Sequence, residues 1–209
     1  MDFVLPPIYP ITDKNLSNRT SHLSILRELV RGGAKLVQIR DKSTPDRELV
    51  IDLRQCVEFA LKTGVTLIVN DRCDLVLSSS AAGVHLGRDD LPPEAARALL
   101  GEEKIIGFST HSQAQVRESI SLPVQYIGFG PVYSTATKAD PIPAVGLNRL
   151  QQACRASSVP VVAIGGIGME QVRDVLAAGA SSAAVISALM KAENLARQME
   201  RLLEAAMEK

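Results

Sequence analysis

The chain has 209 residues, 46% hydrophobic and 22% charged, which is typical of a globular protein with one sizeable core. Its 23 Lys and Arg residues balance its 23 Asp and Glu residues, so no basic excess indicates binding to nucleic acid or to an anionic membrane. No apolar run is long enough to span a bilayer, and the N-terminus lacks the basic-then-apolar pattern of a signal peptide.

Short, continuous apolar runs recur along the chain and predict eight β-strands. Apolar and polar residues do not alternate in these runs, as expected for parallel strands that are covered on both faces. In chain order, the expected strands are Ile8–Ile11, Leu36–Ile39, Thr66–Val69, Gly83–Leu86, Ile105–Phe108, Tyr126–Phe129, Val161–Ile164 and Ala183–Ile186.

Helical stretches lie between these strands, and their ends carry the usual cap residues. The stretch after strand three is the weakest, since only Asp74–Ser80 is available for a helix. The clearest stretches are Leu23–Val30 after a Thr20/Ser21 cap, Pro45–Lys62 before Gly64, Pro92/Pro93 to Gly101, Met169–Ala178 before Gly179, and a last helix with Leu195, Met199, Leu202 and Ala206 on one face.

Eight strand-and-helix units without a linker or a long polar insertion predict one domain over residues 1–209, a (β/α)8 TIM barrel. An open, doubly wound sheet is the alternative. It is disfavoured because no glycine-rich dinucleotide fingerprint follows the first strand.

The loop after strand six is the most informative stretch. The apolar run Tyr126–Phe129 ends at Gly130 and Pro131 and opens into hydroxyl residues and Lys138. Hydroxyl and backbone N–H groups with a lysine are typical of an anion site. A surface turn with an exposed lysine is the alternative. The recurrence of polar residues at other strand ends favours the anion site, because these ends converge on one face of a barrel.

Strands two, three and four end in charged residues. Arg40 and Lys42 are two positions apart, so in an extended segment their side chains point to the same side and can present two cations to one ligand. A run of solvent-exposed charges would have the same pattern. Asn70 and Asp71 end strand three, and Asp90 follows strand four. Oxygen ligands without histidine or thiolate favour Mg²⁺. Helix capping is the alternative role for Asp71.

The remaining strand ends carry mostly neutral donors. Ser109 ends strand five, where a neighbouring His111 is weak support for a nucleophile. Gly165 and Gly166 follow strand seven, and Ser187 follows strand eight. Loops at these two positions of a barrel often bind phosphate through backbone N–H groups, although a tight turn also explains the glycines.

Together the strand ends predict two anion sites. One combines cations with a metal and fits a pyrophosphate, and the other has neutral donors and fits a monophosphate. A diphosphate electrophile and a monophosphate nucleophile imply group transfer with loss of pyrophosphate. No strand end carries an obvious pair of catalytic carboxylates or a catalytic triad.

These strand-end motifs, taken in their order along the sequence, resemble those of the thiamine-phosphate synthase family over essentially the whole chain. The resemblance implies coupling of 4-amino-5-hydroxymethyl-2-methylpyrimidine diphosphate to 4-methyl-5-(2-phosphoethyl)thiazole, or to its 2-carboxylated form, with release of pyrophosphate. The matching motifs are Gln38-Ile39-Arg40-Asp41-Lys42, Val69-Asn70-Asp71, Gly83-Val84-His85-Leu86-Gly87, Gly107-Phe108-Ser109-Thr110-His111, Gly128-Phe129-Gly130-Pro131, Thr135-Ala136-Thr137-Lys138, Ala163-Ile164-Gly165-Gly166-Ile167 and Val185-Ile186-Ser187.

The resemblance also implies roles for individual residues. Arg40, Lys42, Asn70 and Lys138 would hold the pyrophosphate, Asp71 and Asp90 would hold Mg²⁺, Gln38 and Ser109 would contact the pyrimidine, and Thr135, Thr137, Gly165, Gly166, Ile186 and Ser187 would receive the thiazole phosphate. Lys138, Ser109, Arg40 and Lys42 are the expected catalytic residues. Two features depart from the family pattern: Arg88 stands where glutamine is common, and Pro141 and Pro143 follow Lys138.

Two other functions are compatible with a barrel that binds thiazole phosphate. A thiazole tautomerase-like enzyme would need a proton shuttle, with His111 or His85 as candidates, and a non-catalytic regulator would need only the phosphate site. The intact Asn70-Asp71, Asp90 and Thr135-Ala136-Thr137-Lys138 disfavour the tautomerase-like enzyme. Release of pyrophosphate that depends on both substrates and on Mg²⁺ would exclude both alternatives.

The three cysteines, Cys56, Cys73 and Cys154, lack the spacing of zinc or redox pairs. We therefore expect reduced thiols and a cytoplasmic protein. Its partners would be small-molecule substrates and not nucleic acid or membrane, and a homo-oligomer is compatible with the sequence.

Overall fold

Eight parallel strands form a barrel in the computed structural model, which describes residues 3–135 and 143–207. The strands are β1 (Ile8–Pro10), β2 (Leu36–Ile39), β3 (Thr66–Asn70), β4 (Gly83–Leu86), β5 (Ile105–Thr110), β6 (Tyr126–Phe129), β7 (Val161–Ala163) and β8 (Ser182–Val185). They pair in the order β1-β8-β7-β6-β5-β4-β3-β2. The ends of this order also meet, because Ile11 pairs with Gln38 and the Thr12 N–H donates to the Gln38 carbonyl at 2.9 Å. The predicted TIM barrel is confirmed, and the open sheet is wrong.

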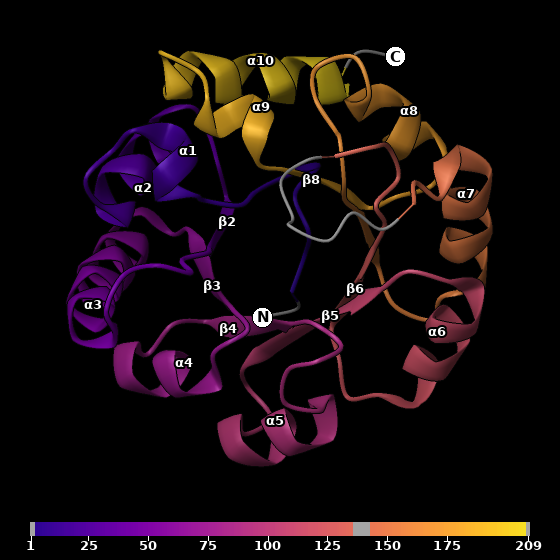
Figure 1. Ribbon diagram of the computed structural model, residues 1–209, viewed down its shortest axis with the longest axis horizontal. Helices are drawn as coiled ribbons and strands as arrows, with labels where there is room; N and C mark the ends of the chain where they lie inside the picture. Colours follow the sequence, from indigo (N-terminus) through magenta and orange to yellow (C-terminus); the bar gives the residue numbers. More distant parts are fainter. Residues whose placement is uncertain (1–2, 136–142, 208–209) are drawn as a thin grey trace.

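Helices surround the strands as a ring (Figure 1). They are α1 (Lys14–Ser17), α2 (His22–Arg31), α3 (Asp46–Thr63), α4 (Cys73–Ser79), α5 (Pro93–Leu100), α6 (Gln113–Glu118), the 3₁₀ turn η1 (Ser119–Ser121), α7 (Gly146–Ala156), α8 (Val172–Ala177), α9 (Ser187–Met190) and α10 (Leu195–Met207). The doubtful helix after strand three is present as α4. Helix α8 begins at Val172, later than the predicted Met169.

Local cap chemistry explains several helix ends. The Ser21 side chain accepts a hydrogen bond from the Ser24 N–H at 3.1 Å and thereby caps α2. Helix α3 ends at Gly64, whose φ of 70° lies in the left-handed region that glycine adopts without strain. The predicted cap and the predicted stop are confirmed at both positions.

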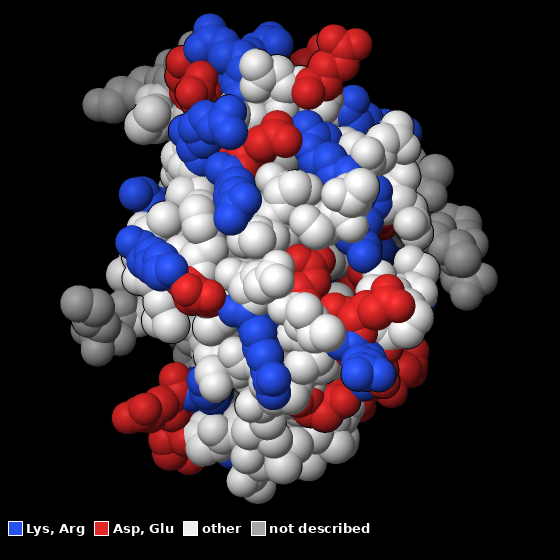
Figure 2. Space-filling view, turned by 90° about the vertical axis from the view of Figure 1, so that its left-hand side faces the viewer, with Lys and Arg blue, Asp and Glu red and all other residues white. Residues whose placement is uncertain are grey.

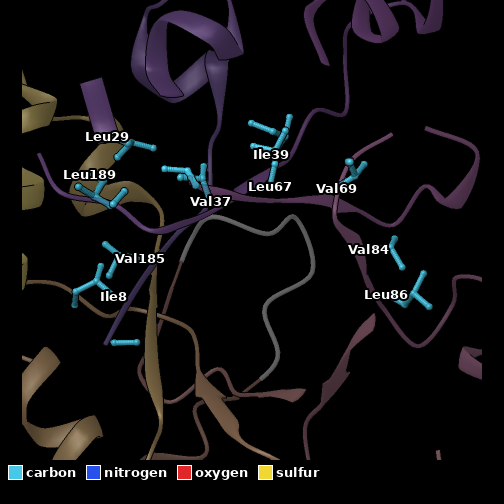
Figure 3. Close-up of a cluster of buried hydrophobic side chains, with 14 of the residues drawn as sticks. Ile8, Leu29, Val37, Ile39, Leu67, Val69, Val84, Leu86, Val185 and Leu189 are labelled. Carbon is cyan, nitrogen blue, oxygen red and sulfur yellow. The ribbon is translucent and has the colours of Figure 1, made fainter. Parts of the chain in front are cut away.

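The core has two parts because strand side chains point alternately outward and inward. The outer part lies between the strands and the helices, and Figure 3 shows Val37, Ile39, Leu67 and Val69 projecting from β2 and β3 into it. The inner part fills the barrel and contains Leu36, Ile68, Tyr9, Tyr126, Val162 and Ala184. Each fully buried aliphatic side chain contributes about 1.5–3 kcal/mol of transfer free energy.

The outer surface carries both signs of charge. Figure 2 shows Lys and Arg side chains interspersed with Asp and Glu over the side of the barrel where α2 and α3 lie. On this side of the barrel, the mixture of signs agrees with the balanced composition. Among the residues that the structure describes, no helix has both the length and the apolar character needed to cross a membrane.

Candidate active site

The inward-facing strand positions bring the predicted polar residues to one end of the barrel. Leu36 packs inside the barrel, so the alternation of β2 also places Gln38 and Arg40 on the inner side. In β3 the same rule places Asn70 on the inner side after Ile68. The polar residues therefore follow the apolar layers of the barrel interior toward the carboxyl ends of the strands.

A first pocket, which we call the carboxylate pocket, lies at the ends of β2, β3 and β4. It has a volume of about 270 Å³ and is lined by Lys42, Asn70, Asp71 and Asp90, among others. These four residues were predicted to serve the pyrophosphate and the metal. The structure brings them together from three separate strand ends.

Asp71 and Asp90 form the centre of the carboxylate pocket. Asp71 has a φ of 64°, a left-handed conformation that is uncommon outside glycine and is found at functional sites. Asp90 accepts a hydrogen bond from the Gly87 N–H at 2.6 Å. Burial and the adjacent Asp71 carboxyl raise the pKa of Asp90 above its usual range. Lys42 forms an ion pair with Asp71, so a cation lies on this carboxylate pair.

The alternative capping role of Asp71 is not supported by the start of α4. Arg72 occupies the N-cap position, and this end has no side-chain cap hydrogen bond. Asp74 instead pairs with Arg72, with 2.8 Å between the Arg72 Nε and the Asp74 carboxylate, and its side chain is 62% exposed. Asp74 is therefore a surface residue, whereas Asp71 faces the pocket.

Arg40 lies beside the carboxylate pocket and contacts a segment that the sequence reasoning missed. Its guanidinium pairs with Asp13 at 3.1 Å. Asp13 and Asn15 line a small pocket with Arg40 and Lys42, and they also line a second, larger pocket that is described below. The polar residues that follow β1 therefore border both of these pockets. Their position directly after a strand is the sequence feature that could have identified them.

The loop that carries Arg40 and Lys42 is anchored by Asp41. The Asp41 carboxylate accepts hydrogen bonds from the N–H groups of Ser43 and Thr44 at 2.9 and 2.8 Å, and from His22 at 2.9 Å. Burial alone would raise the pKa of Asp41, but these hydrogen bonds outweigh it and hold the pKa far below its usual range. Asp41 is a fixed anion under the loop.

His22 joins this anchor to the rest of the barrel and was not found from the sequence. Its side chain is fully buried, and its Nδ1 lies 2.9 Å from the Thr12 hydroxyl, which accepts the Arg40 N–H at 3.2 Å. Burial lowers the pKa of His22 despite the neighbouring Asp41 carboxylate. If His22 is neutral, donates a hydrogen bond to Asp41 and accepts one from Thr12, the hydrogen-bonding groups of all three residues are paired.

A second pocket, which we call the glycine pocket, lies at the ends of β6, β7 and β8. It has a volume of about 720 Å³, and its lining includes Ser134, Thr135, Gly166 and Ser187. Three residues predicted to receive the thiazole phosphate, Thr135, Gly166 and Ser187, are thus brought together. Thr137 and Lys138 lie outside the described residues.

Backbone geometry explains the glycines of this pocket. Gly165 and Gly166 have φ values of 100° and 64°. A Cβ on Gly166 would lie 2.6 Å from the Ser134 carbonyl oxygen, so the close approach of the two loops requires glycine. Gly165 packs against Pro131, and Ile186 is the N-cap residue of α9. Both were predicted to receive the thiazole phosphate, but neither is among the residues that line this pocket.

Backbone N–H groups of the glycine pocket are available to a ligand. Within residues 3–135 and 143–207, the N–H groups of Gly166, Ile167 and Ser187 donate to no protein acceptor. The next N–H, of Gly168, donates to the Gln171 side chain at 3.1 Å. Several unused N–H groups that converge on one pocket are suited to binding an anion, and Lys191 also lines this pocket.

Gln38 and Ser109, the predicted pyrimidine contacts, lie on inward-facing positions of β2 and β5. Gln38 is 2% exposed, and its Nε2 donates to the Tyr9 hydroxyl at 3.0 Å. The Ser109 hydroxyl lies 3.0 Å from Nε2 of His85. Within the described part of the chain, no group of three or more His, Cys, Asp or Glu residues could hold a metal, so any metal must complete its coordination with other ligands.

Comparison with known proteins gives the family. The family model described as thiamine monophosphate synthase matches residues 8–189, which is most of the chain. This chain belongs to the thiamine monophosphate synthase family. The matched range contains the lining of the carboxylate pocket and most of that of the glycine pocket, together with the described residues predicted for them.

Individual members of the thiamine monophosphate synthase family agree with this assignment. The chain is 43% identical to the thiamine-phosphate synthase of Syntrophomonas wolfei and 41% identical to that of Persephonella marina, and each comparison covers 93% of both proteins. The thiamine phosphate pyrophosphorylase structure from Pyrococcus furiosus is 32% identical, covers 96% of both chains and superposes with a TM-score of 0.86. These names favour the synthase over the tautomerase-like and regulatory alternatives.

Proposed function

We propose that this chain is a thiamine-phosphate synthase, which couples 4-amino-5-hydroxymethyl-2-methylpyrimidine diphosphate to 4-methyl-5-(2-phosphoethyl)thiazole, or to its 2-carboxylated form, with release of pyrophosphate. The carrying observation is the presence of two pockets of different chemistry at one barrel mouth. One is lined by several carboxylates and cations, and the other offers N–H and hydroxyl donors, with Asp13 and Lys191 as its charged lining residues. Family membership supports the same reaction.

The carboxylate pocket would receive the diphosphate. Arg40, Lys42 and Asn70 border it and would bind phosphate oxygens. Lys138 would add a charge beside the bridging oxygen, where negative charge accumulates as the C–O bond breaks. These residues stabilise the transition state more than the ground state, which is what accelerates a reaction.

Asp71 and Asp90 fit a magnesium ion. Adjacent carboxylates are the hard oxygen donors that Mg²⁺ prefers, and the ion pair of Lys42 with Asp71 supports a cation site here. Burial and, after it, the adjacent Asp71 carboxyl raise the pKa of Asp90, and a bound divalent cation would favour the charged form of both carboxylates. When bound, the ion would neutralise charge on the departing pyrophosphate.

The glycine pocket would receive the thiazole phosphate. The free N–H groups of Gly166 and Ser187 would donate to it, together with the hydroxyls of Thr135 and Thr137. Gly165 and Ile186 would shape the loops that present these donors. Neutral donors bind a monophosphate without competing for the diphosphate, so each substrate has its own place.

The chemistry needs no general base. The thiazole nitrogen attacks through its lone pair and has no proton to lose, and the aminopyrimidine delocalises the positive charge left at its methylene carbon. Gln38 and Ser109 would orient the pyrimidine between the two pockets. The protein therefore acts through positioning and electrostatics.

Pyrophosphate release tests this proposal. We expect the purified protein to release pyrophosphate only when the pyrimidine diphosphate, the thiazole phosphate and Mg²⁺ are all present. Isomerisation of a thiazole without pyrophosphate would instead establish the tautomerase-like function. Binding of thiazole phosphate without turnover would establish the regulatory function, and either result would overturn the proposal.

A further inference from the structure

A chain of hydrogen bonds crosses the barrel interior and joins Gln38 to Ser109. Gln38 Nε2 lies 3.0 Å from the Tyr9 hydroxyl, and this hydroxyl lies 2.8 Å from that of Tyr126. The Tyr126 hydroxyl lies 3.1 Å from Nδ1 of His85, whose Nε2 lies 3.0 Å from the Ser109 hydroxyl. The five residues come from β2, β1, β6, β4 and β5. The two predicted pyrimidine contacts are therefore the two ends of one chain.

The middle of this chain is buried and closely packed. Tyr9 is 1% exposed and Tyr126 is fully buried, and the His85 and Tyr126 rings stack with centroids 5.5 Å apart. Gly107 provides the space, since a Cβ there would lie 2.6 Å from Nδ1 of His85 and would clash with the Tyr126 ring. Burial raises the pKa of both tyrosines, so both hydroxyls keep their protons and each must donate one hydrogen bond.

The amide of Gln38 sets the direction of the chain. Tyr9 accepts from Gln38 Nε2, so its own proton goes to Tyr126, and the Tyr126 proton goes to Nδ1 of His85. His85 must then carry its proton on Nε2 and donate it to Ser109. Ser109 accepts from His85, and its own O–H is left for a ligand. At the other end, Gln38 Oε1 accepts no hydrogen bond within the described residues and is left as an acceptor.

We propose that Tyr9, Tyr126 and His85 are positioning residues that fix this direction, so that the site presents one acceptor, Gln38 Oε1, and one donor, the Ser109 hydroxyl. An aminopyrimidine has the complementary pattern, since its exocyclic amine donates and its ring nitrogen accepts. The corresponding oxopyrimidine has the reverse pattern and leaves both groups unpaired. This inference rests on the proposed function, which makes the pyrimidine the ligand of Gln38 and Ser109.

The first test needs no substrate. In ¹⁵N-histidine-labelled protein, NMR should find the His85 proton on Nε2, with the signal assigned by its loss in His85→Asn. The Tyr126→Phe variant removes the donor to Nδ1 and should populate the other tautomer. The Tyr9→Phe variant leaves the bond from Tyr126 to His85 in place and should keep the Nε2 proton. A wild-type His85 that carries its proton on Nδ1, or on both nitrogens, overturns the proposed direction.

The second test measures recognition by calorimetry, with the 4-amino pyrimidine diphosphate and its 4-oxo analogue. We expect the wild type to prefer the amine by about a hundredfold or more, because the analogue leaves buried polar groups unpaired. Tyr126→Phe and Tyr9→Phe should each reduce this preference by about tenfold. Both should leave the affinity for thiazole phosphate unchanged. Two variants are used because the second decides the question if the first does not fold.

Thr110→Val is the matched control. Thr110 is buried next to Ser109 on β5 and donates to the Gly128 carbonyl at 2.9 Å, but its side chain takes no part in the hydrogen bonds between Gln38 and Ser109. Its loss of one buried hydroxyl should lower stability and leave the preference for the amine intact. Equal weakening of both pyrimidines in the tyrosine variants would mean that the chain has only a structural role, and would overturn the proposal.

The failure of this inference is distinguishable from the failure of the proposed function. An enzyme that releases pyrophosphate normally while its preference survives Tyr126→Phe and Tyr9→Phe would overturn the inference alone. A wild type that binds neither pyrimidine would overturn the proposed function and the recognition role together. The position of the His85 proton would then still decide the direction of the hydrogen bonds between Gln38 and Ser109.

Discussion

The two pockets of the barrel mouth would bind anions by different means. The carboxylate pocket uses side chains, in which Lys42 and Arg40 are paired with Asp71 and Asp13. The glycine pocket uses backbone N–H groups that the loop geometry of Gly166 aims at the ligand. Negative charge develops on the diphosphate as its C–O bond breaks, so groups that bind it can stabilise the transition state more than the substrate, whereas the thiazole phosphate keeps its charge and its donors would bind substrate and transition state about equally. The difference suggests that one pocket performs the chemistry and the other positions the nucleophile.

The largest effect should come from the carboxylate pocket. Asp71→Asn keeps the size of the side chain and its tolerance of the left-handed backbone, so the fold should persist. Loss of a metal ligand should lower kcat on the order of a hundredfold or more. Steady-state pyrophosphate release at limiting Mg²⁺ measures this decrease in kcat.

Asp74→Asn is the control for that change, because Asp74 is a nearby carboxylate that pairs with Arg72 on the surface. It should leave kcat and the Mg²⁺ requirement unaltered. Normal turnover of Asp71→Asn at limiting Mg²⁺, or equal losses in the two variants, would remove the distinction between the pockets.

A smaller effect is expected in the glycine pocket. Ser187→Asp places a carboxylate against the thiazole phosphate, and like-charge repulsion should raise the KM for that substrate by about tenfold or more. The affinity for pyrophosphate should hardly change. Ser181→Asp, at the exposed opposite end of β8, is the control. A similar loss of affinity for both ligands would show one shared site.

The smallest effect concerns the buried His22 under the loop of the carboxylate pocket. Burial lowers its pKa in the folded state, so below about pH 6.5 only the unfolded chain takes up the proton. Stability should therefore fall as the pH decreases from 7 to 5, by at most about 1.4 kcal/mol per pH unit from this group. Asp41, whose folded pKa is also lowered, loses its contribution only below about pH 4.

Urea unfolding of the wild type and of His22→Gln at pH 7, 6 and 5 measures this contribution. Glutamine can keep the donor to Asp41 but does not titrate. The variant should be less stable at pH 7 and should show a shallower decrease toward pH 5. Parallel pH profiles for the two proteins would mean that His22 does not titrate on unfolding.

Much of this arrangement could be predicted from local sequence. Apolar runs predict the strands, and strand ends converge in a barrel, so Asn70, Asp71 and Ser187 could be expected at the barrel mouth, where they line the two pockets. The tyrosine chain could not be predicted, because Tyr9 and Tyr126 look like ordinary core residues and meet across 117 positions of sequence. His22 was missed for a related reason. A histidine at a helix start resembles a surface residue until its tertiary partners are known.

The claim of two separate anion sites is tested most directly by calorimetry on the wild type. Pyrophosphate is titrated with and without Mg²⁺, before and after saturation with 4-methyl-5-(2-phosphoethyl)thiazole. We predict that both ligands bind together, one of each per chain, and that only pyrophosphate requires the metal. Competition between the two ligands, or an equal Mg²⁺ requirement for both, would contradict the account.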